Sequence, residues 1–259
     1  MRMIKWGLAI VGALLLSLSL FSSKENDVES FKATVVERFP HWDRAYTQGL
    51  FFYNGSLYES SGEYGKSFFR EVDLEKGSTV RSFNLEPTLF AEGATVLNDE
   101  LFLLTWRENS VLVYDIENFK LKRKLFNPNE GWGLTTDGKE LIASDGSSKL
   151  YFYNATNFAP VSEIEVTLNG KKVELLNELE YINKEVWANI YGSETIVIIN
   201  PKSGKVRATV DCSELLPIYM RTPKTDVLNG IAYNRIDRSI YLTGKNWPML
   251  FKIELLKVK

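Results

Sequence analysis

A five-fold internal repeat is the feature of this sequence that most restricts its fold. A turn-rich segment followed by a pair of apolar or aromatic residues recurs at Leu57-Tyr58, Leu101-Phe102, Leu141-Ile142, Val186-Trp187 and Ile240-Tyr241. Equivalent positions, such as 48, 92, 132, 177 and 229, lie 40 to 52 residues apart, so five units fill nearly all of the chain after residue 30. A repeat of this length indicates one supersecondary unit used five times.

Each unit carries the pattern of four short β-strands. The first two form a hairpin around a turn such as Asn54-Gly55 or Asn98-Asp99, which are residue pairs typical of tight β-turns. A second hairpin follows, with apolar strands such as residues 111–114 and 196–199. Four strands in each unit of this size are typical of a β-propeller blade. The sequence therefore predicts an all-β fold, a five-bladed β-propeller with four strands per blade.

The fifth unit reaches the end of the chain at Lys259 after only three strands. Residues 31–39 form a candidate strand just before the first unit, and we expect it to complete the last blade. This pairing closes the ring and leaves no free sheet edge. A β-sandwich, which would not need an equal repeat, and an open meander, which would leave two edges bare, are the alternatives.

The first 30 residues differ in composition from the repeats. Arg2 and Lys5 precede an uncharged run from Trp6 to Ser23, which predicts that residues 1–23 are a signal peptide or a membrane anchor. Residues 24–30 form a polar spacer, and residues 31–259 are the propeller domain. We expect an exported protein, periplasmic, extracellular or anchored to the outer side of the cytoplasmic membrane. Cleavage and retention of the leader both remain open.

The composition excludes several kinds of site. The chain has one cysteine, Cys212, and one histidine, His41, which excludes an intrachain disulfide and a Cys/His metal cluster. His41 is expected to be a surface or packing residue. The formal net charge of −2 gives no sign of nucleic-acid binding. We expect a monomer without metal or cofactor, with no membrane contact beyond an N-terminal anchor, that binds a small molecule or a peptide.

Equivalent positions of propeller blades converge around one axis, and here they carry unlike side chains. One ring consists of Gln48, Glu92, Trp132, Asn177 and Asn229. A second ring consists of Gly62, Trp106, Gly146, Tyr191 and Lys245. Packing alone favours the same residue type at equivalent positions, so this divergence predicts a pocket with a few polar groups directed inward.

Glu92 is the main candidate for chemistry in this pocket. A carboxyl group next to Trp106, Trp132 and other aromatic rings is partly desolvated, which raises its pKa toward the range of a general acid or base. In one alternative, the polar side chains only close the central channel through hydrogen bonds. In another, a hydrolase uses Glu92 with Glu178 or Glu180 as paired carboxylates. Either Glu178 or Glu180 could also bind a cation.

Seven short segments resemble the plant and bacterial glutaminyl-peptide cyclotransferases. They are residues 46–50, 90–93 with 104–106, 131–134, 144–146, 177–180, 228–232 and 242–248. The resemblance implies a five-bladed propeller that converts an N-terminal glutamine to pyroglutamate and releases ammonia, without a metal. Tyr191 stands where the family commonly has Trp, and Tyr46 where it often has Phe.

The resemblance also implies roles for single residues. Glu92 corresponds to the general acid and base, and Asn177 and Lys245 to its polar partners in catalysis. The expected substrate-binding residues are Gln48, Trp106, Trp132, Tyr191 and Asn229. The competing hypothesis is a non-catalytic propeller of the cell envelope that binds a peptide or another ligand in the same pocket.

Overall fold

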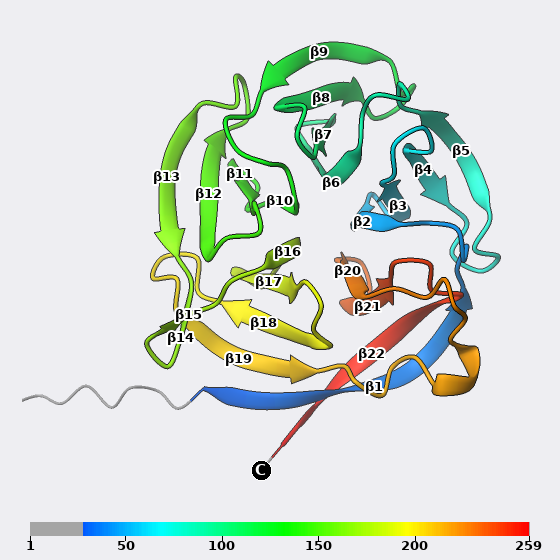
Figure 1. Cartoon of the computed structure of the whole chain (residues 1–259), viewed down its shortest axis with the longest axis vertical. Coiled ribbons are helices and arrows are strands. Elements are labelled where there is room, and N and C mark those ends of the chain that lie inside the picture. Colours follow the sequence, from blue (N-terminus) through cyan, green and yellow to red (C-terminus); the bar gives the residue numbers. More distant parts are fainter. Residues whose placement is uncertain (1–27, 259) are drawn as a thin grey trace, which may run out of the picture.

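Residues 28–258 are described by this computed structural model, and within them the fold is built of β-strands with one short 3-10 helix and no α-helix (Figure 1). The strands are β1 (Glu29–Pro40), β2 (Thr47–Tyr53), β3 (Ser56–Ser61), β4 (Phe68–Val72), β5 (Thr79–Asn84), β6 (Ala91–Leu97), β7 (Glu100–Thr105), β8 (Ser110–Asp115), β9 (Leu121–Phe126), β10 (Leu134–Thr136), β11 (Glu140–Ala143), β12 (Lys149–Asn154), β13 (Pro160–Glu165), β14 (Thr167–Leu168), β15 (Lys171–Lys172), β16 (Leu176–Ile182), β17 (Glu185–Ile190), β18 (Thr195–Ile199), β19 (Val206–Asp211), β20 (Leu228–Asn234), β21 (Ser239–Gly244) and β22 (Met249–Lys257). The 3-10 helix η1 is Ile218–Met220. The expected all-β fold is confirmed.

The strands form sheets that surround a common axis. Three sheets contain four consecutive strands each, β2 to β5, β6 to β9 and β10 to β13. A fourth sheet contains eight strands in the order β16-β17-β18-β19-β1-β22-β21-β20, and β14 and β15 form a small separate hairpin. Figure 1 shows β2, β6, β10, β16 and β20 nearest the centre of the ring. The two ends of the eight-stranded sheet, β16 and β20, contact each other there.

Tight turns set the hairpins as the sequence predicts. Asn54 and Gly55 both have positive φ angles, 48° and 85°, and so do Asn98 and Asp99, with 54° and 60°. Two successive residues with positive φ form the turn whose twist matches that of paired strands. Asn, Asp and Gly tolerate this conformation better than other residues do. The first hairpin of the repeat therefore follows from its turn residues.

Strand β1 joins the beginning of the chain to its end. It pairs antiparallel with β22 from Phe31 opposite Lys257 to Pro40 opposite Met249, so the expected partner of the N-terminal strand is present. The strand begins at Glu29, two residues before the predicted start, and its first four residues also pair in parallel with β19. The sequence did not predict this second pairing, which merges the last two groups of strands into one sheet.

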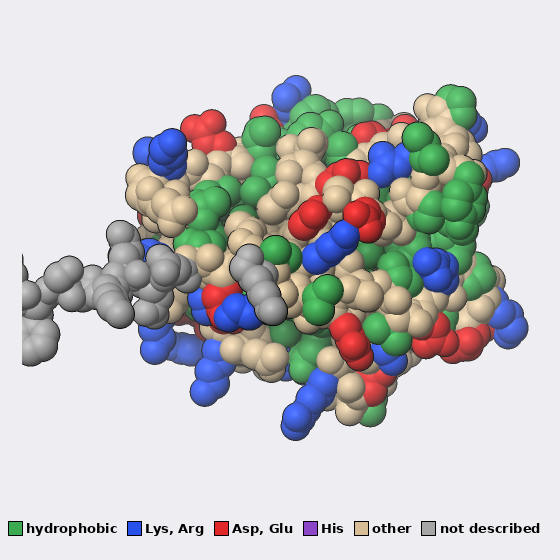
Figure 2. Space-filling model, turned by 90° about the horizontal axis from the view of Figure 1, so that it is seen from below, with side chains coloured by type: hydrophobic (Ala, Val, Ile, Leu, Met, Phe, Trp, Pro, Cys, Tyr) green, Lys and Arg blue, Asp and Glu red, His purple; other side chains and the backbone are tan. Residues whose placement is uncertain are grey.

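Ion pairs support this junction. The carboxylate of Glu29 contacts both Arg207 of β19 and Lys257 of β22. Figure 2 shows acidic and basic side chains interspersed on the face seen from below. The proposed leader, residues 1–23, and residues 24–27 of the spacer lie outside the described part of the chain. Within residues 28–258, no helix is long and apolar enough to cross a membrane.

Carboxylates connect the inner strands across the axis. Glu178 of β16 accepts hydrogen bonds from the backbone N–H groups of Leu50 in β2, at 3.2 Å, and Ile231 in β20, at 2.8 Å. Glu180 accepts one from the backbone N–H of Tyr233 at 3.0 Å and one from the hydroxyl of Thr135 at 3.3 Å. Both glutamates are buried. They link inner strands that are not neighbours in any ladder of backbone hydrogen bonds.

These contacts bear on the predicted cation site. The oxygens of Glu178 and Glu180 face N–H and hydroxyl donors, which satisfy a carboxylate without a metal. Among the described residues there is no group of three or more His, Cys, Asp or Glu that could hold a metal ion. In the described chain both glutamates therefore hold the inner strands together through hydrogen bonds, and a cation at either residue stays a prediction.

Candidate active site

The ring positions lie at one end of the central axis because of how each hairpin is built. Gln48, Glu92 and Asn177 are each the second residue of an inner strand, whereas Trp106 and Lys245 directly follow the neighbouring antiparallel strand. The beginning of one strand and the end of its antiparallel partner lie at the same end of a hairpin. The repeat therefore brings all these side chains to one opening.

A backbone irregularity at the ring positions directs the side chains. The pairing register shifts between Thr47 and Gly49 in the first inner strand and between Ala91 and Ala94 in the second. Equivalent shifts occur in β16 and β20. A bulge turns a side chain that would otherwise alternate between the faces of the strand. Gln48 and Glu92 lie within these bulges and line the pocket.

The residues after the ring positions allow the inner strands to lie close together. A Cβ atom on Gly93 would lie 2.4 Å from the backbone N of Leu134, and one on Gly133 would lie 2.0 Å from the backbone O of Asn177. Only glycine fits such contacts. The Glu-Gly and Trp-Gly pairs in the sequence thus couple a pocket side chain to a close backbone contact between sheets.

Seven of the predicted site residues line one cavity of about 420 Å³. They are Gln48, Glu92, Trp106, Trp132, Asn177, Tyr191 and Lys245. Tyr46, Glu63 and Phe90 complete the lining. Tyr46 and Phe90 each precede a ring position by two residues, so the two-residue period of a strand could have identified them. No sequence signal identified Glu63.

Burial dominates the electrostatics of Glu92. Its side chain is 5% exposed, and burial raises its pKa well above the usual value for glutamate. The Lys245 ammonium opposes this rise, whereas the carboxylates of Glu108 and Glu130 add to it. The Nε2 atom of Gln48 donates a hydrogen bond of 3.2 Å to Oε1 of Glu92. The pocket therefore raises the pKa of Glu92 and favours the neutral acid over the carboxylate.

Lys245 lies between two aromatic faces. Its Nζ atom is 4.5 Å from the ring centroid of Tyr46 and 5.3 Å from that of Tyr191. Burial lowers the pKa of Lys245, and the carboxylates of Glu92 and Asp226 counteract this effect. Aromatic faces attract a cation without removing its N–H donors. The ammonium group is thus held in the pocket with donors available for a ligand.

The three carboxamides have different surroundings. Asn177 lines the pocket, and its buried Oδ1 atom has no hydrogen-bond partner in the described chain. Asn229 does not line the pocket. Its Nδ2 atom donates to the backbone O of Thr47 at 2.9 Å and to Oε1 of Gln48 at 3.4 Å, so it orients Gln48 from behind. Asn229 thus supports Gln48, and its predicted contact with the substrate stays a prediction.

Two glycines of the second ring make room for the aromatic walls. A Cβ atom on Gly146 would lie 2.6 Å from the ring of Trp132, and one on Gly62 would lie 2.2 Å from the ring of Phe90. Trp132 packs edge to face against Tyr191, with ring centroids 5.8 Å apart, and Phe90 packs against Trp106 at 5.4 Å. The aromatic side chains of Phe90 and Trp132 therefore occupy the space that a side chain at Gly62 or Gly146 would need.

Comparison with known proteins agrees with this geometry. The family model for glutamine cyclotransferase matches residues 8–255. The chain belongs to the glutamine cyclotransferase family. A glutaminyl-peptide cyclotransferase of Arabidopsis thaliana is 41% identical over 238 residues, which cover 90% of this chain and 73% of that protein. The crystal structure of Myxococcus xanthus glutaminyl cyclase matches with a TM-score of 0.84 and 34% identity, and covers 90% of this chain and 100% of that one.

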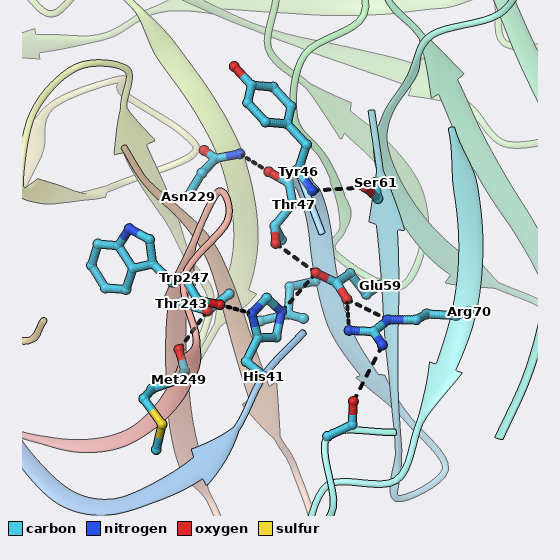
Figure 3. Close-up of polar contacts among 12 residues, drawn as sticks. His41, Tyr46, Thr47, Glu59, Ser61, Arg70, Asn229, Thr243, Trp247 and Met249 are labelled. Atoms are coloured by element: carbon cyan, nitrogen blue, oxygen red, sulfur yellow. Dashed lines mark hydrogen bonds and ion pairs between the residues drawn. The ribbon is translucent and has the colours of Figure 1, made fainter. Parts of the chain in front are cut away.

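In this member of the family, a buried charge network holds the segments that carry Gln48 and Lys245 (Figure 3). His41 contacts the backbone O of Trp247 through Nδ1, at 2.7 Å, and Oε1 of Glu59 through Nε2, at 2.9 Å. The Thr47 hydroxyl donates to the same Glu59 oxygen at 2.6 Å. Arg70 donates to the other oxygen at 2.7 Å. Thr47 precedes Gln48, and Trp247 follows Lys245 by two residues.

Glu59 is the centre of this network. Burial alone would raise its pKa, but Arg70 and His41 hold the pKa at about 2. His41 is buried rather than exposed, and its two ring nitrogens face a carbonyl and a carboxylate, which only accept hydrogen bonds. The packing role that the sequence predicted for His41 is therefore a role in an ion network. The network connects β2, β3, β4 and the loop after β21.

Proposed function

We propose that this protein converts the N-terminal glutamine of peptides and proteins to pyroglutamate, with release of ammonia, and that Glu92 is the general acid and base. One observation supports this proposal most directly. A carboxyl group with a raised pKa is buried in an aromatic pocket, beside a lysine and an unpaired carboxamide oxygen, in a glutamine cyclotransferase.

The reaction needs two proton transfers, and Glu92 serves both. The neutral α-amine of the substrate attacks the δ-carbon of its own side-chain amide, and the C–N bond of a five-membered ring forms. The Glu92 carboxylate accepts the proton that the attacking nitrogen loses. The resulting acid then gives this proton to the amide nitrogen, whose bond to carbon breaks so that ammonia leaves. Burial raises the pKa of Glu92, which stabilises the acid formed in the first transfer and so supports its use as the proton donor in the second.

Lys245 and Asn177 stabilise the charge that develops in this reaction. The Lys245 ammonium donates to the oxygen of the tetrahedral intermediate, where negative charge develops. The free Oδ1 atom of Asn177 accepts a hydrogen bond from a nitrogen of the substrate. Both groups are buried, so their interactions are stronger than they would be in water.

The aromatic walls supply the geometry of ring closure. Trp106, Trp132 and Tyr191 confine the glutamine side chain in a folded conformation that places the amine next to the amide carbon. The reaction is intramolecular, so this confinement removes much of the entropic barrier. Gln48, oriented by Asn229, holds the Glu92 carboxyl in place.

The number of blades and the export of the protein belong to the same proposal. Five groups of four strands, namely β2–β5, β6–β9, β10–β13, β16–β19, and β20–β22 with β1, support a five-bladed propeller in which the eight-stranded sheet supplies two blades. The charged and apolar pattern of residues 1–23 supports export to the periplasm, the cell exterior or the outer side of the cytoplasmic membrane.

A coupled ammonia assay on a panel of short peptides that begin with glutamine tests the activity. We expect ammonia release and a mass loss of about one ammonia from these peptides, and none from matched peptides that begin with asparagine or with acetylated glutamine. Binding of the peptides without ammonia release would instead favour the non-catalytic propeller of the cell envelope.

A further inference from the structure

Glu130 connects the two tryptophan walls of the pocket. Its Oε2 atom accepts a hydrogen bond of 2.9 Å from Nε1 of Trp106 and a longer one of 3.4 Å from Nε1 of Trp132. Trp106 follows β7 and Trp132 precedes β10, so the two rings come from different sheets. An indole has one N–H donor, and here both donors are directed to one carboxylate oxygen.

The other oxygen of Glu130 is also engaged. Nε of Arg107 donates to Oε1 at 3.1 Å, and the guanidinium carbon of Arg107 lies 3.8 Å from the ring centroid of Trp106. Arg107 therefore covers one face of the Trp106 ring while Glu130 holds its N–H edge. Together these contacts fix the orientation of a side chain that otherwise rotates about two torsions.

The backbone around Glu130 is fixed as well. The N–H of Gly131 donates to the backbone O of Trp106 at 2.9 Å, and a Cβ atom on Gly131 would lie 2.4 Å from the backbone O of Thr105. The segment that carries Glu130 is thus anchored against the end of β7. An exposed glutamate paired with an arginine usually contributes little to stability. This one is held in place beside two half-buried rings that line the pocket.

We propose that Glu130 is a positioning residue that fixes Trp106 and Trp132 relative to each other, and through them the glutamine side chain of the substrate. The effect of Glu130 on substrate binding rests on the proposed function. Its effect on the positions of Trp106 and Trp132 does not, and can be tested without turnover. Preorganised walls lose less side-chain freedom when the substrate binds, so Glu130 lowers the KM rather than raising kcat.

Steady-state kinetics with a short glutamine peptide tests this role in the full-length protein. Because the Glu130 charge also adds to the pKa of Glu92, each variant is measured at its own pH optimum. There we expect KM to rise about 10-fold in Glu130→Ala and kcat to change less than about 2-fold, because the lost contacts hold the walls and not the reacting atoms. Glu130→Gln keeps an acceptor oxygen for Trp106 and should restore KM to within about 3-fold of the wild type. The matched control is Glu163→Ala on β13, where an exposed glutamate pairs with Lys149.

Indole N–H signals in proton–nitrogen NMR spectra test the walls without turnover. Trp106→Phe and Trp132→Phe assign the two signals. We expect both signals to move in Glu130→Ala and to stay in place in Glu163→Ala, because a carboxylate acceptor shifts a bound N–H proton. Ammonia release by the wild type is measured alongside, so that failure of the proposed function is seen separately from failure of this inference.

Two results would overturn the inference. Unchanged indole signals in Glu130→Ala would show that Glu130 does not hold the tryptophans. A fall in kcat with an unchanged KM, or a shift of the pH profile alone, would show that Glu130 acts on the chemistry through its charge near Glu92 and not through the walls.

Discussion

The Nε2 atom of Gln48 lies 3.2 Å from Oε1 of Glu92, although the two residues belong to different sheets. They occupy the same position in consecutive repeats. Contact between equivalent residues of neighbouring units is what a ring of repeats produces near its axis. A substitution at Gln48 or Glu92 therefore affects two neighbouring units.

Replacement of Glu92 by Gln removes the proton shuttle but keeps the size of the side chain. We expect kcat to fall about 10²- to 10⁴-fold, the usual contribution of general acid–base catalysis. The thermal midpoint should not fall, because a buried carboxyl group with a raised pKa is replaced by a neutral amide. Ammonia release and thermal unfolding of the same preparation measure both effects. Activity within tenfold of the wild type would contradict the role given to Glu92.

Gly146→Ala tests whether the Trp132 ring can line the pocket only when position 146 has no side chain. Gly146 has a φ of 82°, and its new methyl group would lie 2.6 Å from Trp132, so both stability and substrate binding should suffer. Gly138→Ala is a matched control, because Gly138 has a φ of 92° and nothing within 4 Å of a new Cβ. We expect both variants to lose about 1 kcal/mol or more in stability. Only Gly146→Ala should raise KM, and an equal KM in the two variants would count against the wall.

Glu59→Gln leaves Arg70 and His41 buried without their shared anion. We expect the free energy of unfolding to fall by about 3–5 kcal/mol, as is typical when one partner of a buried ion pair is removed. Urea denaturation measures the change. Glu163→Gln, which breaks an exposed pair with Lys149, should cost less than about 1 kcal/mol. A loss in Glu59→Gln no larger than in this control would show that the network does not stabilise the fold.

Glu180 should make the protein less stable as the pH rises from about 4.5 to 8. Burial raises its pKa to about 8 in the folded chain, above the ordinary value of 4.5. The unfolded chain therefore releases the proton at lower pH, so the stabilisation is complete below the unfolded pKa and is lost as the pH approaches 8. The loss from this group reaches about 3–5 kcal/mol at most.

Urea denaturation across this pH range checks the effect. Glu180→Gln keeps an oxygen for the N–H of Tyr233, and its stability should vary less with pH than that of the wild type. Glu92 and Glu178 also have raised pKa values and give the same sign, so the dependence should be reduced and not abolished. An identical slope in the variant and the wild type would exclude Glu180 as a source.

The sequence predicts those features that recur. Turn residues, strand patterns and ring positions appear in several units, so Glu92, Trp132 and Lys245 could be placed at one opening by counting alone. Asn229 shows the limit of counting, because an equivalent position near the axis can lie behind the pocket lining instead of in it. The resemblance to a family added roles that spacing could not supply.

Contacts that occur only once in the structure, and not in every repeat, were not predicted from the sequence. His41, Glu59 and Arg70 come from three different segments and are not equivalent positions of the repeat, so nothing in the sequence indicates that they meet. The parallel pairing of β1 with β19 is also a single event between segments about 180 residues apart. Glu130 lies two residues before a ring position, but only the structure shows that both tryptophans donate to it.

The position of β1 between β19 and β22 has a consequence for the order of folding. Within the described residues, β1 is synthesised long before β22, and their antiparallel pairing forms only once β22 is present, because Phe31 pairs opposite Lys257. Until β22 is available, β1 can pair only with β19, through its first four residues, and the eight-stranded sheet remains incomplete. Completion of this sheet therefore needs segments from both ends of the described chain, and loss of β22 would leave β1 with only its short parallel pairing to β19.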